Sequence, residues 1–475
     1  MTTDSLATAE SLPSPTKTPH KRRNGWYRAF WRWHFYASFL VIPVLLMLTV
    51  TGLVYLFRFQ IEPALHPQLM TLDPPAGAVP QPYTTQHAAV ADAFPNATIM
   101  SMTEPSDPDH SAVFSLSMPN GTPRDAYVNP WTGDVLGSLN PDQTVSGIAV
   151  RLHAELMMAP WGDYLIELAA CWAIVMALTG YVLFFKGRAA RTRRKGDGVT
   201  GASLRHRHAT VGSVVGLGLL LLLVSGLPWT GFWGGTAQQM ATANGSSLWS
   251  QDPGAVSKPA STLDESLPHS HRHEVPWGLG KSGVPGADDD RDADQAVASL
   301  DTAIAVADKH GLRHPMTVTL PESSQGVFSV ISYAFNNPSD ERTVHVDRYD
   351  GQVVASYGYN NYPALAKTVS QGIALHEGRR FGTANMWVTT AFCLMVIFMC
   401  LTGPLMWWRR RPRRHGAVGA PRGRLPIKAT PALAAGLLAL GTVLPMFGAS
   451  LIVVLLVDQL LLRRVPALAR WLNVT

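Results

Sequence analysis

The stretch VGSVVGLGLLLLLVSGLPWTGF, residues 211–232, decides the fold class of this chain. It carries no charged side chain, and a helix rising about 1.5 Å per residue crosses a hydrocarbon core of about 30 Å over this length. Three more predominantly apolar stretches occupy residues 35–57, 164–185 and 383–408. The sequence therefore predicts four membrane-spanning helices. A fifth apolar segment, residues 429–462, has Pro445 and Gly448 near its centre, which favours a helical hairpin over one long span.

Composition points the same way. Charged residues make up 15% of the 475 residues, against about a quarter in soluble domains, which argues against a soluble enzyme. The three cysteines, Cys171, Cys393 and Cys400, all fall inside apolar stretches. Neither a disulfide framework nor a thiolate metal cage is therefore expected.

Lysine and arginine gather in the polar segments beside the apolar stretches. Residues 1–33, 186–208 and 409–428 hold 6, 8 and 8 of the 39 basic residues. Because such residues mark the cytoplasmic side of a membrane protein, we expect a cytoplasmic N-terminus and two large loops on the outer side. This topology accounts for the net charge of +6, so membrane lipid is an expected partner and nucleic acid is not.

These features divide the chain into successive segments. They are a basic tail (1–33), a first transmembrane helix (34–58), a first outer domain (59–150), a second transmembrane helix with an outer extension (151–186), a basic loop (187–207), a third transmembrane helix (208–234), a second outer domain (235–370) with an insertion (236–292), a fourth transmembrane helix with an outer extension (371–408), a second basic loop (409–428), the hairpin (429–462) and a tail (463–475).

The spanning segments repeat a pattern. Each contains a hydroxyl residue followed by glycine, and these pairs are Thr51-Gly52, Thr179-Gly180, Ser225-Gly226 and Thr402-Gly403. A histidine precedes the glycine by 18 residues in the first and third helices, and by 27 in the second and fourth. The outer loops also match, because residues 127–133 and 345–351 each read as a strand followed by a glycine turn. The sequence predicts an internal parallel repeat with two small α+β modules outside the membrane.

The histidines of this pattern are the candidate ligands. His34 and His208 open the first and third helices on the cytoplasmic side, whereas His153 and His376 precede the second and fourth on the outer side. A pair of neutral imidazoles from facing helices suits the axial ligation of a haem iron, whereas zinc or copper usually takes more ligands. The sequence predicts two such pairs, one near each membrane face. His206 competes with His208, and the 18-residue spacing selects His208.

Neighbouring residues fit this hypothesis. Ser38 and Gly212 follow the inner histidines by one helical turn and leave the helix surface low enough for a flat porphyrin. Arginines lie beside every candidate ligand, as propionate partners or as ordinary interfacial anchors. They are Arg32, Arg151, Arg207, Arg379 and Arg380.

Two features leave alternatives open. His153 lies 11 residues before the apolar stretch that starts at Tyr164, so its helix either extends above the membrane or bends near Pro160. His269, His271 and His273 alternate along the chain and form a weak second metal site for a divalent cation or iron. A plain polar loop is the interpretation that we favour for these three.

The chain resembles the PepSY-associated transmembrane family of bacterial inner-membrane proteins. The resemblance rests on His34 with Thr51-Gly52, on residues 127–133, 152–155, 208–212 and 226–234, and on residues 372–382 with His376. Some members of that family are dihaem siderophore-iron reductases. The resemblance implies an all-α membrane bundle with two PepSY-like periplasmic domains, two haem b groups, and electron transfer to a ferric siderophore.

The electron donor is open, since no phosphate loop or dinucleotide motif is visible; a membrane quinol or a cytoplasmic reductase would supply electrons. The rival hypotheses are a non-catalytic, membrane-anchored PepSY protein that binds, inhibits or senses a partner, and a component of an iron or siderophore transporter.

Overall fold

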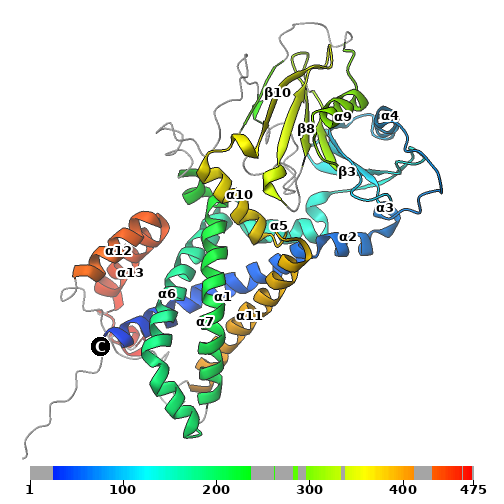
Figure 1. Ribbon diagram of the computed structural model, residues 1–475. Coiled ribbons are helices and arrows are strands. Elements are labelled where there is room, and N and C mark those ends of the chain that lie inside the picture. The colour runs from blue at the N-terminus through cyan, green and yellow to red at the C-terminus, as the bar shows by residue number, and fades with distance from the viewer. Residues whose placement is uncertain are drawn as a thin grey trace, which may run out of the picture.

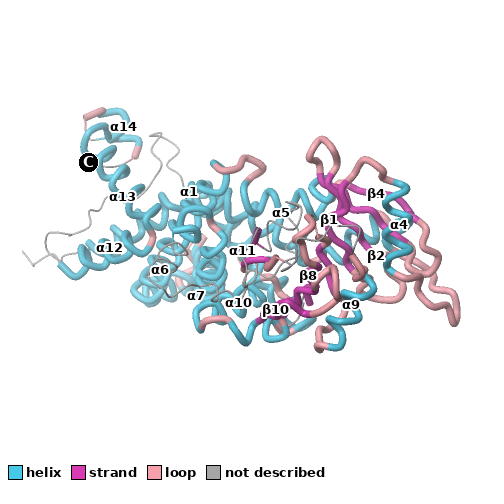
Figure 2. Tube along the Cα trace, turned by 90° about the horizontal axis from the view of Figure 1, so that it is seen from above, coloured by secondary structure: helices cyan, strands magenta, loops and turns pink. Residues whose placement is uncertain are grey.

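A computed structural model describes residues 25–199, 201–236, 261–262, 282–286, 296–321, 323–332, 337–410, 431–462 and 464–472. The chain forms a bundle of long helices with a β-sheet domain at one end (Figure 1). Figure 2 shows the sheet on one side of the bundle and the helices α12 and α13 on the other. The segment with His269, His271 and His273 lies outside the described residues.

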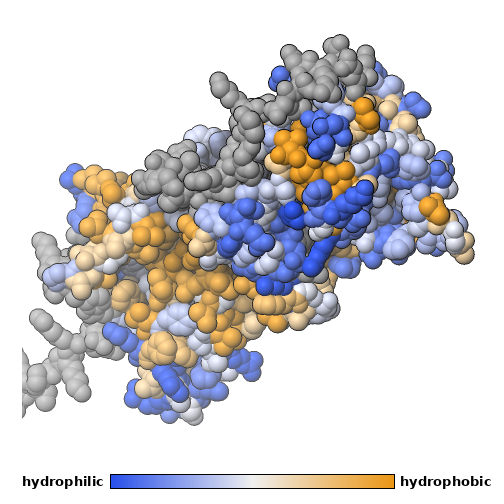
Figure 3. Space-filling model, turned by 45° about the horizontal axis from the view of Figure 1, so that its top comes forward, coloured by the Kyte–Doolittle hydropathy of each residue, from blue (hydrophilic) through white to orange (hydrophobic). Residues whose placement is uncertain are grey.

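Among the described residues, five helices are long and apolar enough to cross a membrane, and the chain is a multi-pass membrane protein. The candidate spans are Tyr27–Leu56, Trp161–Gly196, Ala202–Trp229, Gly382–Arg410 and Pro445–Leu462. Figure 3 shows apolar surface over the helices, with polar surface at the free end of the bundle and over the sheet domain. This is the distribution that a lipid-embedded bundle requires. The prediction of a membrane helical protein is confirmed.

The helices are bounded as follows. They are α1 (Gly25–Leu56), α2 (Arg58–Leu65), α3 (Pro67–Met70), α4 (Tyr83–Ala93), α5 (Val145–Glu155), α6 (Trp161–Gly196), α7 (Ala202–Gly226), α9 (Leu300–Lys309), α10 (Ala364–His376), α11 (Gly382–Arg410), α12 (Pro431–Val443), α13 (Pro445–Val457) and α14 (Pro466–Trp471).

Four of these helices pack against one another. α1 contacts α6 and α11, and α7 contacts the same two helices. Buried apolar side chains fill the interfaces, among them Val41 of α1, Cys171 of α6 and Leu219 of α7. The basic side chains of the last turn of α6 stabilise its carbonyl end, because cations favour the negative pole of the helix dipole.

The helices α5 and α10, which carry the outer histidines His153 and His376, are separate from the membrane-spanning helices that follow them. Leu156 and Met157 adopt left-handed backbone angles with φ of 54° and 58°, which ends α5 before α6 begins. Gly378, with φ of 72°, separates α10 from α11 in the same way. Of the two alternatives for His153, the structure has the bend before Trp161 and not a continuous extension.

The C-terminal apolar segment forms two helices, α12 and α13, that pack against each other. A Cβ atom on Gly441 would lie 3.2 Å from the Cα of Gly448, so the absence of side chains permits this close contact. α13 is held to α6, where Trp172 stacks edge-on against Phe447 at 5.1 Å and donates a hydrogen bond to Ser450 Oγ at 3.0 Å.

The sheet domain differs from the predicted pair of modules. Its eight strands form one antiparallel sheet in the order β10-β9-β8-β7-β1-β2-β3-β4, with four strands from each outer loop. The seam is the pairing of β1 with β7, in which Ser101 faces Thr319 and Thr103 faces Thr317. The strands are β1 (Thr98–Thr103), β2 (Ala112–Ser117), β3 (Pro123–Val128), β4 (Val135–Leu139), β7 (Met316–Thr319), β8 (Phe328–Ser332), β9 (Arg342–Val346) and β10 (Val353–Gly358), beside a small ribbon of β5 (Ser261–Thr262) and β6 (Gly283–Val284).

One face of the sheet is apolar and is covered by α4 and α9. Phe114, Val330 and Val344 on this face are fully buried, together with Val90 of α4 and Ala303 of α9. The shared core explains why the two loops form one sheet. A four-stranded half with one helix buries less apolar surface than the joined sheet, and burial of apolar surface drives the association.

Candidate functional site

The outer candidate histidines lie together above the bundle. His153 lies in the last turn of α5 and His376 is the last residue of α10, and their ring centroids are 6.4 Å apart with ring planes at 84°. Trp229 stacks edge-on against His376 at 6.1 Å and closes one side of the pair.

This separation fits a metal ion held between two imidazoles. Metal–nitrogen bonds of about 2 Å and a ring radius of about 1 Å on each side give a centroid separation of about 6 Å. The observed 6.4 Å agrees with that value. A haem iron with two axial imidazoles is therefore compatible with this pair.

Hydroxyl groups on neighbouring helices orient the outer imidazoles. Thr51 Oγ1 lies 3.0 Å from His153 Nδ1, and Ser225 Oγ lies 3.1 Å from His376 Nδ1. Thr51 donates its proton to the carbonyl of Met47 at 2.9 Å, so its oxygen accepts from the imidazole N–H. Protonation at Nδ1 leaves the lone pair on Nε2, the nitrogen that ligates a metal.

The inner histidines repeat this arrangement at the other end of the bundle. His208 Nδ1 lies 2.9 Å from Thr402 Oγ1, which donates to the carbonyl of Phe398 at 2.8 Å. His34 Nδ1 lies 2.9 Å from the carbonyl of Met176 and 3.4 Å from Thr179 Oγ1. A carbonyl only accepts, so His34 also carries its proton on Nδ1.

His34 and His208 are close enough to interact electrostatically, which places them at the same end of the bundle. Gly52 lies beside His153, and it follows His34 by 18 residues on α1. At about 1.5 Å per residue the inner and outer pairs are therefore about 27 Å apart along the helix. The same spacing separates His208 from Gly226, which lies beside His376.

Three of the four glycines in the hydroxyl–glycine pairs lie against an imidazole, and Gly180 has the tightest contact. A Cβ atom on Gly180 would lie 3.2 Å from His34 Cε1, and Cβ atoms on Gly52 and Gly226 would lie 3.5 Å from Cε1 of the outer histidines. Gly403 differs, because its Cβ would meet Ile42. The sequence showed the recurrence of these pairs, but it did not identify them as the partners of the histidines. Their constant spacing from the histidines was the available signal.

The predicted arginines have varied surroundings. Arg379 forms a buried ion pair with Glu377, and Arg380 donates to Gln371. Arg151 lies 3.7 Å from Glu155 and the Arg32 guanidinium lies 5.1 Å from the Tyr36 ring centre. The remaining one, Arg207, is exposed to the surroundings.

One arginine that the sequence analysis missed joins the outer cluster. The Arg58 guanidinium lies 3.8 Å from the centre of the Tyr55 ring and 4.3 Å from that of Phe59. Arg58, Glu377 and Arg379 each lie within electrostatic range of Tyr55. Two cations thus lie near Tyr55, and Arg379 among them is ion-paired with Glu377, the residue after His376.

The small residues and the competing histidine are placed as follows. Ser38 donates to the carbonyl of Phe35 at 2.6 Å. A Cβ on Gly212 would lie 2.8 Å from Met399 Cε, so this glycine permits the packing of α11.

His206 Nδ1 is buried and has no hydrogen-bond partner within the described parts of the chain, whereas His208 contacts Thr402. No group of three or more His, Cys, Asp or Glu residues suited to a metal occurs among the described residues.

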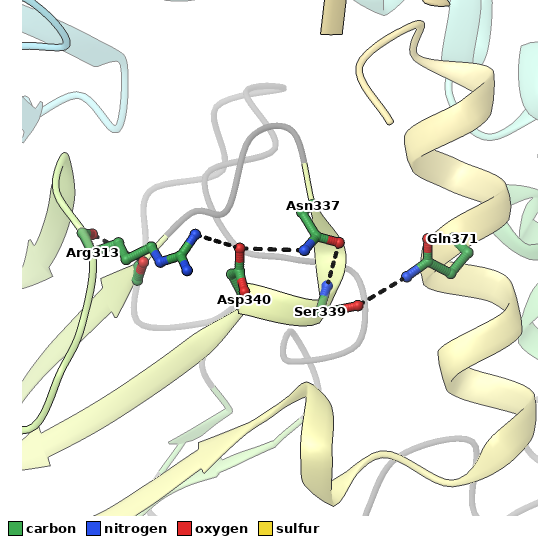
Figure 4. Close-up of polar contacts among 6 residues, drawn as sticks. Arg313, Asn337, Ser339, Asp340 and Gln371 are labelled. Carbon is green, nitrogen blue, oxygen red and sulfur yellow. Dashed lines mark hydrogen bonds and ion pairs between the residues drawn. The ribbon is translucent and has the colours of Figure 1, made fainter. Parts of the chain in front are cut away.

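α10, which carries His376, is attached to the sheet domain. Gln371 on α10 donates to Ser339 Oγ at 3.4 Å (Figure 4). It also donates to Tyr359 OH at 3.1 Å. The turn that holds Ser339 is itself fixed by Asp340, which accepts from Arg313 at 2.7 Å. The position of His376 is therefore coupled to the sheet.

A second contact buries a carboxyl group between sheet and helix. Glu341 accepts from Ser370 Oγ of α10 at 3.0 Å and from Tyr362 OH at 3.2 Å. Burial raises the pKa of Glu341 to about 7, although Arg379 opposes the shift. This carboxyl is therefore partly protonated at neutral pH.

Residues 31–410 match the family model described as "PepSY-associated TM region". No curated protein sequence matches the chain.

Proposed function

The chain belongs to the PepSY-associated transmembrane family, and on that premise we propose that it is a dihaem b oxidoreductase of a bacterial inner membrane. It passes electrons outward and reduces ferric iron held by a siderophore. The proposed architecture is a four-helix core with a C-terminal hairpin, built as an internal parallel repeat, in which each outer loop contributes a PepSY-like half to the joined sheet. The basic residues at the free end of the bundle favour a cytoplasmic N-terminus and a periplasmic sheet domain.

The observation that carries the proposal is the pairing of four histidines with four hydroxyl residues. α1 supplies Thr51 to His153 of α5, and α6 supplies Thr179, beside the Met176 carbonyl, to His34 of α1. In the second half, α7 supplies Ser225 to His376 of α10, and α11 supplies Thr402 to His208 of α7. A histidine that only snorkels to the interface needs no fixed tautomer, whereas a metal ligand does.

The proposed haem ligands come from both halves of the chain. His34 and His208 would hold the inner group, and His153 and His376 the outer one. A bound haem b supplies reversible one-electron transfer at its iron. The chain fixes the ligand tautomers, excludes water with apolar helices, and offers Arg58 and Arg379 as counter-charges to propionates. We retain Arg32, Arg151, Arg207 and Arg380 as further candidates.

The reaction is a one-electron reduction of Fe³⁺ to Fe²⁺ in the chelate. A membrane quinol or a cytoplasmic reductase is oxidised to provide the electron. Ferrous iron binds less tightly to a siderophore than ferric iron does, so the reduction frees the metal on the outer side. No proton transfer to the chelate is required for the electron balance.

The test is the absorption spectrum of the purified protein after reduction with dithionite. Two haem b groups per chain are expected, and His34→Ala and His208→Ala should remove the same spectral component. His153→Ala and His376→Ala should remove the other. His206→Ala is the matched control and should leave both components in place.

A folded, colourless protein would overturn the reductase and favour a membrane-anchored protein that binds or inhibits a partner. Loss of different components in His34→Ala and His208→Ala would overturn the pairing even with haem present.

A further inference from the structure

The helices α6 and α7 continue past the apolar part of the bundle, at the end opposite the sheet domain. Figure 1 shows them meeting at the lower end of the bundle. The apolar stretch of α6 ends at Phe185, whereas the helix itself ends at Gly196. We call the described residues between 186 and 207 the basic hairpin.

The basic hairpin carries a high positive charge, and Figure 3 shows polar surface at this end of the molecule. Residues 186–207 include eight lysines and arginines against one acid, Asp197, which gives a net charge of +7. None of the exposed cations forms an ion pair with another described residue. These exposed cations are Lys186, Arg188, Arg193, Arg194, Lys195 and Arg207.

The hairpin extends farther than contact with lipid headgroups requires. From Lys186 to Gly196 α6 continues for 11 residues, which is about 16 Å of helix. The headgroup layer on each side of a bilayer is about 5–8 Å thick, so the last turn of α6 lies about 10 Å outside it. In α11, by contrast, Arg409 directly follows Trp408 and lies at the level of the headgroups. The cations at the tip of the hairpin therefore exceed what membrane orientation needs.

The basic hairpin leads to the inner histidine pair. α7 runs from Ala202, beside the turn, to His208 over six residues, which is about 9 Å of helix. Arg410 continues the positive surface toward this pair, because it is close enough to interact electrostatically with both His208 and Arg205. Its guanidinium lies 5.9 Å from the centre of the Trp31 ring on α1. A protein seated on the hairpin would thus lie at the end of the bundle that holds the inner pair.

The position and the sign of this charge restrict the electron donor. A quinol is uncharged and dissolves in the hydrocarbon, so cations about 10 Å outside the headgroups do not contact it. A soluble protein with an acidic face is attracted, since opposite charges steer association and orient the two partners. Flavin and iron–sulfur proteins deliver electrons singly, which matches the one-electron reduction of Fe³⁺.

We propose that the basic hairpin is the docking site for a soluble, acidic one-electron carrier, with a flavin or iron–sulfur centre, on the cytoplasmic side. This inference rests on the proposed reductase function and names its electron donor. The reduced carrier loses one electron and the ferric iron of the chelate gains it, while no bond between carrier and chain forms or breaks.

The test uses flavodoxin as the probe, because it is a small acidic protein with a flavin cofactor. Its binding to the full chain in nanodiscs of phosphatidylcholine is measured by calorimetry at low ionic strength. Arg193→Gln/Arg194→Gln should weaken binding at least about tenfold, since steering by complementary charge contributes about 10- to 1,000-fold. At 1 M salt, where the screening length is about 3 Å, the variant and the unchanged chain should bind equally weakly.

Two control variants separate charge from folding. Arg193→Lys/Arg194→Lys keeps both charges and should bind like the unchanged chain. Arg124→Gln/Lys309→Gln removes the same charge from exposed positions of the sheet domain and should also bind normally. Normal binding by Arg193→Gln/Arg194→Gln, or an equal loss in the sheet-domain variant, would overturn the proposal.

The alternative is that lipid headgroups cover the hairpin. The natural cysteines are buried, so a fluorophore can be attached to Arg194→Cys or, as the matched control, to Arg409→Cys. Lipids with nitroxide-labelled headgroups should quench the label at position 409 strongly and the label at position 194 weakly. Equal quenching at both positions would overturn the proposal.

The outcome is separable from that of the reductase proposal, because the binding measurement needs neither haem nor an electron. A haem-free chain that binds flavodoxin through Arg193 and Arg194 would refute the reductase and keep the docking site. A chain that contains both haems and is reduced by duroquinol, but does not bind flavodoxin, would refute the docking site alone.

Discussion

The hydroxyl–histidine contacts make one prediction that can be tested by removing a single hydroxyl group. Thr51→Val replaces the hydroxyl of Thr51 by a methyl group of similar size. Thr51 is 6% exposed and its oxygen accepts from His153 Nδ1 at 3.0 Å. The substitution therefore removes the hydrogen bond and leaves the packing of α1 in place.

The magnitude follows from the buried imidazole N–H that loses its acceptor. Leaving such a donor unsatisfied costs about 1–3 kcal/mol. At about 1.4 kcal/mol per factor of ten, the group held by His153 should bind roughly 5- to 150-fold more weakly. Loss of comparable ligand-orienting contacts in metal sites lowers affinity about 10- to 100-fold.

The assay is a haem titration of the haem-free protein, followed through the two spectral components. Thr49→Val is the matched control, because Thr49 is also buried in α1 but donates only to the carbonyl of Leu45. Only the component that depends on His153 and His376 should weaken in Thr51→Val. Equal titrations for both variants, or weakening of the component that depends on His34, would refute the reasoning.

Three further predictions concern packing and pH. Gly180→Ala places a Cβ 3.2 Å from His34 Cε1 and should weaken haem binding only in the inner spectral component, as measured by a haem titration. Gly436→Ala is the control, because its Cβ would have nothing within 4 Å, and it should leave both components unchanged. The pKa of Glu341 rises from 4.5 to about 7 on folding, so the sheet domain loses about 3 kcal/mol of its free energy of unfolding as pH rises from 4.5 to 7. Glu341→Gln should abolish this loss, as measured by urea unfolding at a series of pH values. The pKa of His345 falls from 6.5 to about 4 on folding, so the free energy of unfolding declines by about 3 kcal/mol as pH falls from 6.5 to 4. Urea unfolding of His345→Gln should not show this decline. An unchanged pH profile in either variant would contradict the assigned burial.

The histidine sites are formed by the packing of helices that are far apart in the sequence. The contact of Thr51 with His153 spans 102 residues of sequence, and that of Ser225 with His376 spans 151. Spacing showed that a histidine accompanies each hydroxyl–glycine pair, but it did not show which helix supplies which partner. Arg58 escaped notice because nothing local distinguishes it from any other interfacial arginine.

The sequence by itself located the long apolar helices, the basic segments at their ends and the four candidate histidines. Length, hydropathy and spacing are properties of about 20 consecutive residues, and they do not depend on distant contacts. Only the tertiary structure decided that the chain bends at Met157 and that β1 pairs with β7 in a single sheet. These features arise where two distant segments bury surface against each other. The free energy of that burial depends on both segments, so neither segment's sequence predicts it alone.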